Sequence, residues 1–158
     1  MNYLFVADRM LGRLAKMLRL LGYDTIYASD ISPAQLKELA RREDRVILTR
    51  GEVSRRFTGM ENVFSLKSEK SAEQLREVLE KYRLDLQGGL WTRCTLCNAT
   101  ITRIEKAQVE SLVKPKVFQL YAEFYRCSGC GQVYWQGSHV ERILRNLAAI
   151  LGKPAEEE

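Results

Sequence analysis

The first 22 residues constrain the fold more than any other stretch of the sequence. Residues 3–7 form a short apolar run without alternation, which is typical of a strand buried on both faces, and Asp8 closes the run. The apolar side chains that follow recur at helical spacing, at Leu11, Leu14, Ala15, Leu18 and Leu21, and Gly22 suits the left-handed residue after a helix. This order predicts a strand, an acidic residue at its carboxyl end, and a helix.

Asp8 has two interpretations. A carboxylate directly before a helix is well placed to cap the first turn, and such caps are common. In open α/β sheets, however, ligands gather outside the carboxyl ends of the strands. The predicted helix also carries four basic residues and no acid: Arg9, Arg13, Lys16 and Arg19. An acid beside a basic helix face favours a phosphate substrate and a metal ion, whereas the basic residues alone are equally typical of a solvated helix face.

Strands and helices alternate as far as residue 82. Three further strands are predicted at residues 23–28, 45–49 and 62–66. Two capping-box patterns, which begin at Ser32 and Ser71, predict helices to about residue 42 and to residue 82, and a short helix is indicated near Val53. Asp30 places a second carboxylate at the same edge as Asp8. The alternation predicts right-handed crossovers and a mainly parallel sheet.

The pattern changes after two adjacent glycines, Gly88 and Gly89, which mark a predicted domain boundary. All four cysteines lie beyond it, in two Cys-x-x-Cys pairs separated by 29 residues: Cys94, Cys97, Cys127 and Cys130. Without a recognisable secretion signal, this spacing favours a tetrahedral zinc site with four thiolate ligands over disulfides, and redox chemistry by one pair is the alternative. Such a site is closed and structural, because the metal replaces a core that a small module lacks. Residues 117–125 are strand-like, and a last helix is predicted at residues 140–151.

Three residues after the second cysteine pair have both functional and structural interpretations. Tyr134 and Trp135 are able to stack on bases, and His139, the single histidine, is able to contact a phosphate or take part in proton transfer. Aromatic side chains also fill small cores, and we favour packing for Tyr134 and Trp135. His139 is not expected to bind zinc, because four cysteines already complete the site.

The charge of the chain bears on its partners. A net charge of +5 makes nucleic acid or another polyanion a more natural partner than an acidic protein. No apolar stretch approaches the length that spans a membrane, and the start of the chain does not resemble a secretion signal. We therefore expect a cytoplasmic protein without a membrane partner; the sequence does not indicate its oligomeric state.

Several segments together resemble the Mut-seven C-terminal ribonuclease family. They are residues 5–24, 47–50, 93–98, 127–131 and 134–139, and the resemblance runs from about Tyr3 to Arg145 in order and spacing. It implies a PIN-like nuclease domain at residues 1–87, with a three-layer α/β/α fold and a mainly parallel sheet. A four-cysteine zinc ribbon with a C-terminal helix is expected at residues 90–151, before a disordered acidic tail at residues 152–158. The resemblance also implies RNA cleavage that depends on Mg²⁺ or Mn²⁺, with Asp8 and Asp30 at matching acidic positions.

The third acidic position departs from the family pattern. Members usually read Leu-Thr-Arg-Asp, whereas this chain reads Leu-Thr-Arg-Gly up to Gly51 and places Glu52 one residue later. A PIN-like site holds one or two divalent ions through carboxylates, so a missing ligand weakens metal binding. Glu52 has a longer side chain that is able to reach back, but a one-residue shift at a strand end also turns the side chain. Two nearby acids are interpreted as a solvated helix residue, Glu38, and a turn residue, Glu43.

Three functions remain open, in decreasing order of preference. The first is a Mg²⁺- or Mn²⁺-dependent endoribonuclease that uses Asp8, Asp30 and Glu52. Its expected RNA contacts are Arg9, Arg13, Lys16, Arg50, Tyr134, Trp135 and His139. The second is an RNA-binding protein whose PIN-like site is degenerate because of Gly51. The third is a zinc-stabilised protein-interaction adaptor, which predicts no salt-sensitive RNA binding.

Overall fold

The structure is a computed structural model that describes residues 2–51, 53–86, 89–150 and 152. It divides into two compact units, Met1–Asn98 and Ala99–Glu158, called here the first and the second unit. The predicted domain limits stay a prediction, and Gly88 of the predicted boundary lies outside the described residues. The predicted disordered tail beyond Gly152 also lies outside the described residues.

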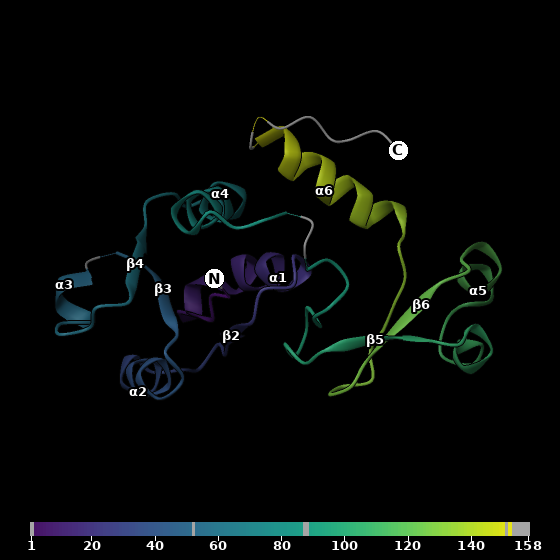
Figure 1. The fold of residues 1–158 in the computed structure, drawn as a ribbon, viewed down its shortest axis with the longest axis horizontal. Helices are drawn as coiled ribbons and strands as arrows, with labels where there is room; N and C mark the ends of the chain where they lie inside the picture. Colours follow the sequence, from purple (N-terminus) through teal and green to yellow (C-terminus); the bar gives the residue numbers. More distant parts are fainter. Residues whose placement is uncertain (1, 52, 87–88, 151, 153–158) are drawn as a thin grey trace. The chain divides into compact units, whose positions relative to one another are not determined.

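A four-stranded parallel sheet forms the centre of the first unit (Figure 1). Its strands are β1 (Phe5–Ala7), β2 (Thr25–Tyr27), β3 (Val46–Arg50) and β4 (Val63–Leu66), in the spatial order β2-β1-β3-β4. The two central strands are buried almost throughout, as their continuous apolar runs predict. Both therefore end at one edge of the sheet with their carboxyl termini side by side.

Helices cover both faces of this sheet, which confirms the predicted α/β fold with a parallel sheet. The 3-10 helix η1 (Arg9–Leu11) and α1 (Gly12–Leu20) follow β1, and α2 (Pro33–Glu43), α3 (Val53–Arg56) and α4 (Ser71–Tyr82) follow the next three strands in turn. Helices α1 and α4 contact each other, whereas α2 packs on the opposite face, where Leu36 and Ala40 meet Val6 and Ile47 (Figure 1). The predicted apolar stripe of α1 is fully buried.

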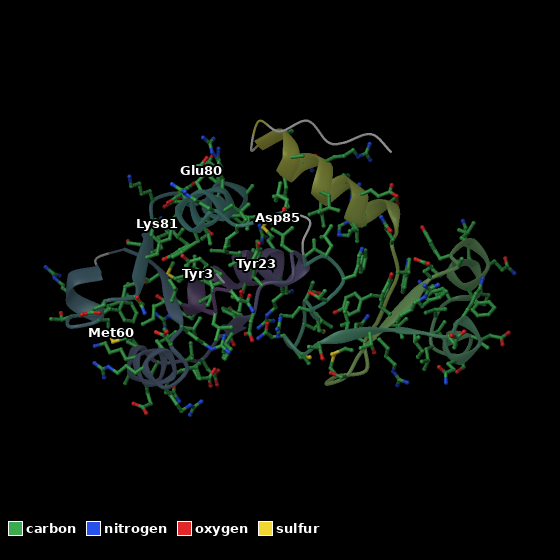
Figure 2. The ribbon with its side chains drawn as sticks, in the orientation of Figure 1. Tyr3, Tyr23, Met60, Glu80, Lys81 and Asp85 are labelled. Carbon is green, nitrogen blue, oxygen red and sulfur yellow. The ribbon has the colours of Figure 1, made fainter. Side chains whose placement is uncertain are left out.

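Aromatic side chains fill the sheet face beneath α4. The ring centroid of Tyr82 lies 4.8 Å from that of Tyr3, 5.5 Å from Phe5 and 5.8 Å from Phe64. Nearby, the Tyr23 hydroxyl donates to the Asp85 carbonyl oxygen at 2.7 Å (Figure 2). These contacts attach α4 and the segment after it to the sheet, because tilted and edge-to-face pairs add to ordinary apolar burial.

The two capping-box predictions have different outcomes. The first is confirmed, because Ser32 Oγ accepts from the Gln35 N–H at 3.2 Å and Gln35 Oε1 accepts from the Ser32 N–H at 2.8 Å. The second is wrong, because Ser71 is already helical and Lys70 at the N-cap makes no side-chain cap. Instead, the Glu77 carboxylate accepts from two backbone N–H groups that lead into α4. This carboxylate holds the segment before α4 in place and does not cap the first turn of the helix.

A three-stranded antiparallel sheet forms the second unit. It consists of β5 (Ile101–Ile104), β6 (Phe124–Cys127) and β7 (Val133–Tyr134), together with η2 (Lys106–Val109), α5 (Pro115–Leu120) and α6 (Ser138–Ile150). The prediction of a strand at residues 117–125 is wrong over its first part. Pro115 has the fixed φ of a first helical residue and begins α5, so β6 starts only at Phe124.

The buried core of the second unit is small. One cluster of buried side chains consists of Val109, Phe124 and Val133, with half-buried side chains around them, and Ile101 and Leu147 are buried as well. Modules of this size gain little stability from apolar burial alone, which agrees with the predicted need for a metal. Within the described part of the chain, no helix combines the length and the apolar character required to span a membrane.

Candidate functional site

Asp8 occupies the carboxyl edge of the parallel sheet, with 5% of its surface exposed. Because Ala7 pairs with Leu48, Asp8 lies beside Thr49, whose hydroxyl donates to Asp8 Oδ2 at 3.1 Å. The other oxygen, Oδ1, accepts from the Arg9 N–H at 2.7 Å and caps η1. The cap interpretation of Asp8 is therefore confirmed, and its second oxygen remains directed toward β3.

A cation also reaches Asp8. Arg56 Nη1 of α3 lies 3.4 Å from Asp8 Oδ2, and about half of the Arg56 side chain (47%) is exposed. A divalent ion bound at Oδ2 would meet the positive charge that Arg56 places there. The sequence pattern does not single out Thr49 or Arg56, because the parallel register and the position of α3 bring them to Asp8.

The structure does not bring Asp30, the second predicted acid, into the surroundings of Asp8. Asp30 is exposed and lines a different hollow of about 400 Å³ with Glu38 and Arg42, to which Asp8 does not contribute. Glu52 lies outside the described residues. Among the residues that the structure describes, the four cysteines are the single group of three or more acidic, histidine or cysteine side chains close enough to share a metal ion. Metal ligation by Asp8, Asp30 and Glu52 stays a prediction.

Gly51 stands in a backbone conformation that favours glycine. Its φ is +111°, and no neighbouring atom lies within 4 Å of a Cβ placed there. The backbone angle, and not lack of space, therefore disfavours a side chain at this position. Its carbonyl oxygen accepts from Ser65 Oγ at 3.1 Å. The aspartate of the family pattern would require this strand end to change its conformation.

Three of the predicted RNA contacts line one hollow of the first unit. Arg9, Arg13 and Arg50 surround a space of about 600 Å³ together with Lys70, and we call this space the basic hollow. Lys16 is exposed but does not line it. The sequence pattern gives no reason to include Lys70, because it reaches the hollow only through the position of α4.

The remaining predicted RNA contacts belong to the second unit. The Trp135 ring centroid lies 6.3 Å from that of Phe124 and 6.4 Å from that of Tyr121, which agrees with the packing interpretation. Tyr134 pairs with Tyr125 across the sheet. His139 Nδ1 lies 3.1 Å from Arg142 Nη2. RNA contacts by Tyr134, Trp135 and His139 stay predictions.

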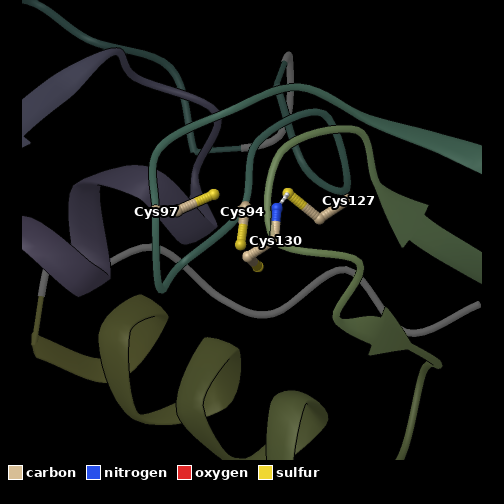
Figure 3. Close-up of side chains that lie close together, drawn as sticks. All are labelled: Cys94, Cys97, Cys127 and Cys130. Atoms are coloured by element: carbon tan, nitrogen blue, oxygen red, sulfur yellow. Dashed lines mark hydrogen bonds between the residues drawn. The ribbon is translucent and has the colours of Figure 1, made fainter.

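The four cysteines converge on one point, and none of them is joined in a disulfide (Figure 3). Their sulfur atoms all lie within 4.8 Å of one another. Zn–S bonds of 2.3 Å in a tetrahedron place the sulfurs about 3.8 Å apart, so the cluster fits zinc. Cys127 Sγ also accepts from the Gly129 N–H at 3.3 Å and the Cys130 N–H at 3.4 Å, and these bonds hold the sulfur in place. Cys94, Cys97, Cys127 and Cys130 can therefore hold a structural zinc ion.

The first cysteine pair is attached to the first unit by a buried cation. Arg19, with 5% of its surface exposed, donates to the carbonyl oxygens of Thr95 at 3.1 Å and Leu96 at 3.0 Å. Its Nε donates to the Thr25 carbonyl oxygen at 2.8 Å. Burial lowers the pKa of Arg19 from its ordinary value. The sequence offers a signal, because Arg19 lies four residues after Ala15 on the buried stripe of α1.

A polar network continues this attachment beside β2. Asn98 Oδ1 accepts from the Thr25 N–H at 3.0 Å, and Asn98 Nδ2 donates to Asp24 Oδ1 at 2.8 Å. Arg45, almost fully buried, donates to the same Asp24 oxygen at 2.7 Å. Burial raises the pKa of the Asp24 carboxyl, but the hydrogen bonds from Arg45 and Asn98 outweigh it and hold this pKa below its ordinary value. The network therefore favours ionised Asp24.

Replacing Asp24 with asparagine is expected to lower the free energy of unfolding by about 2 kcal/mol at pH 7, because it weakens hydrogen bonds between charged groups. The folded-state pKa of Asp24 is lowered, so its contribution is fully present above the unfolded pKa and is lost as the pH falls through the folded pKa. The difference in the free energy of unfolding between the native protein and Asp24→Asn should therefore become smaller as the pH falls below about 4. Urea unfolding at pH 7 and pH 3 measures this difference. The same difference at both pH values would contradict a stabilising role of ionised Asp24.

Comparison with known proteins adds one match. The model of a family described as the Mut7-C RNAse domain matches residues 3–147. No curated protein matches the chain.

Proposed function

Since this chain belongs to the Mut7-C RNAse domain family, we propose that it is a metal-dependent endoribonuclease that hydrolyses RNA at the edge of the sheet occupied by Asp8. The family implies RNA as the substrate. A cytoplasmic location stays a prediction of the sequence.

One observation carries the proposal. Asp8 presents a buried carboxylate at the carboxyl edge of a parallel sheet. Asp8 itself does not line the basic hollow, but Arg9 and Arg50, which do, directly follow Asp8 and its hydrogen-bond partner Thr49 in the chain. Ligands of open α/β sheets gather at this edge. A phosphodiester held by these cations would lie next to Asp8.

Asp8 Oδ2 would contribute to holding a Mg²⁺ or Mn²⁺ ion, and Asp30 and Glu52 are its predicted partners. Such an ion activates water and neutralises charge on the phosphate under attack. The residues of this chain perform the other tasks: Thr49 orients the carboxylate, and the cations of the basic hollow bind the RNA backbone. The zinc ion has no part in this chemistry, because a site with four thiolates is closed.

Two observations favour an RNA-binding protein with a degenerate site as the second candidate. Gly51 replaces an acidic ligand in a backbone conformation unsuited to aspartate, and Arg56 already neutralises Asp8. Cleavage of a mixed pool of structured and single-stranded RNA with Mn²⁺ separates the two candidates. A complete lack of salt-sensitive RNA binding would instead favour the adaptor.

Replacing Arg56 with alanine is expected to tighten Mn²⁺ binding at Asp8 about two- to fivefold, because a partly exposed ion pair that competes with the metal is worth up to about 1 kcal/mol. Electron paramagnetic resonance of free Mn²⁺ measures the affinity. Arg41→Ala, an exposed arginine on α2, is the matched control and should not change it. Equal Mn²⁺ affinity in Arg56→Ala and the native protein would show that Arg56 does not compete for Asp8.

A further inference from the structure

The basic hollow gathers cations from three separate segments of the first unit. Arg9 and Arg13 come from η1 and α1, Arg50 from the end of β3, and Lys70 from the start of α4. A strand of RNA that crosses a surface needs cations spread along its path. Here the fold instead brings them to one concave place.

Two of these four cations have no carboxylate partner in the described part of the chain. Four cations and one carboxylate, Glu69, line the hollow, and Glu69 forms an ion pair with Arg50. Lys70 has a carboxylate of Glu73 at 3.7 Å. Across the described ranges of the chain, Arg9 and Arg13 have no carboxylate within salt-bridge distance. Neighbouring like charges repel, so the arrangement is suited to an anionic ligand.

The size and the apolar lining indicate which anion fits. A space of about 600 Å³ lies within the range of small-molecule sites, so it is large enough for a nucleotide. Met10 on its wall has 63% of its surface exposed, next to buried Leu11 and Leu14. The Tyr27 hydroxyl donates to the Arg9 carbonyl oxygen at 2.9 Å and fixes the backbone that carries these side chains. The lining thus combines concentrated positive charge with an apolar surface for one base.

We propose that the basic hollow binds the terminal phosphate monoester of an RNA chain, with the terminal base against Met10. A monoester carries a charge of about −1.5 to −2 at pH 7, whereas an internal diester carries one charge, so convergent cations favour a phosphorylated end. This inference rests on the proposed function. It implies that the enzyme acts close to a phosphorylated end, because Arg9 and Arg50 of the hollow directly follow Asp8 and Thr49 in the chain.

The test compares three single-stranded oligoribonucleotides of one sequence, with a 5′-phosphate, a 3′-phosphate or hydroxyls at both ends. Fluorescence anisotropy without added Mg²⁺ or Mn²⁺ measures binding in the absence of cleavage. At least one phosphorylated oligonucleotide is expected to bind about tenfold more tightly than the hydroxyl form, and the tighter of the two identifies the end. Equal increases in affinity from a 5′-phosphate and a 3′-phosphate also support the proposal if the substitution of a hollow residue removes both.

Two variants establish that dependence. Arg13→Gln should reduce the preference for the phosphorylated end to about twofold or less, whereas Arg41→Gln, outside the hollow, should keep it. A preference that survives in Arg13→Gln, or equal binding of all three oligonucleotides, would overturn the inference and leave the proposed function standing. No salt-sensitive binding of any oligonucleotide would overturn the proposed function itself.

Discussion

Replacing Asp8 with asparagine is expected to reduce RNA cleavage at least about a hundredfold while the protein stays folded. Asparagine caps a helix as well as aspartate does, so Oδ1 can still accept from the Arg9 N–H. The variant loses the negative charge that a divalent ion needs, and Arg56 then faces a neutral amide. Cleavage rates of an RNA pool with Mn²⁺, together with thermal unfolding by circular dichroism, measure both effects.

Asp44→Asn is a matched control, because Asp44 is exposed and lies at the end of α2, away from the basic hollow. Cleavage by Asp8→Asn at the native rate would show that Asp8 is only a helix cap. If the native protein binds RNA without cutting it, the degenerate-site alternative holds. In that case the Gly51→Asp substitution is not expected to restore cleavage, because the φ of +111° at this position disfavours aspartate.

Replacing Cys127 with serine is expected to release zinc and to unfold the three-stranded sheet of the second unit. Structural zinc contributes on the order of 10 kcal/mol to folding in small modules, and apolar clusters such as Val109, Phe124 and Val133 rarely contribute as much in a module of this size. The parallel sheet of the first unit has its own core and should stay largely folded. Elemental analysis measures the zinc, and amide hydrogen exchange shows which strands lose protection.

Ser128→Ala tests whether the effect depends on the sulfur. Ser128 is exposed and neighbours Cys127, so its replacement should leave the zinc content at one ion per chain. Native protein that contains no zinc would refute the site. A Cys127→Ser variant that keeps zinc and protected strands would show that three sulfurs suffice.

The sequence predicts best those features that depend on neighbours along the chain. The continuous apolar runs at β1 and β3 and the reciprocal cap at Ser32 each need only local residues, and all three are confirmed. At Ser71 the same local pattern misleads, because the helix already includes Ser71 and its N-cap is Lys70. At residues 117–125 strand-forming side chains suggest β structure, but Pro115 begins a helix.

The candidate site is less predictable because tertiary structure assembles it. Periodicity and strand ends identify Asp8, and cysteine spacing identifies the zinc site. The partners of Asp8 come from the register between β1 and β3, which pairs Ala7 with Leu48, and from the placement of α3. Lys70 joins the basic hollow only because α4 begins there. Contacts of this kind leave no periodic trace in a sequence.

Two sets of hydrogen bonds imply an order of assembly. Arg19 donates to the carbonyl oxygens between Cys94 and Cys97, and Asn98 is bonded to Thr25 of β2. Both residues act within the first unit, so Cys94 and Cys97 reach their positions as that unit folds. Two of the four thiolates are then prearranged before any metal arrives, and the ion meets a bidentate chelate instead of four mobile side chains. Prearrangement lowers the entropy lost on binding. Zinc would thus bind first to Cys94 and Cys97, which are synthesised before Cys127 and Cys130.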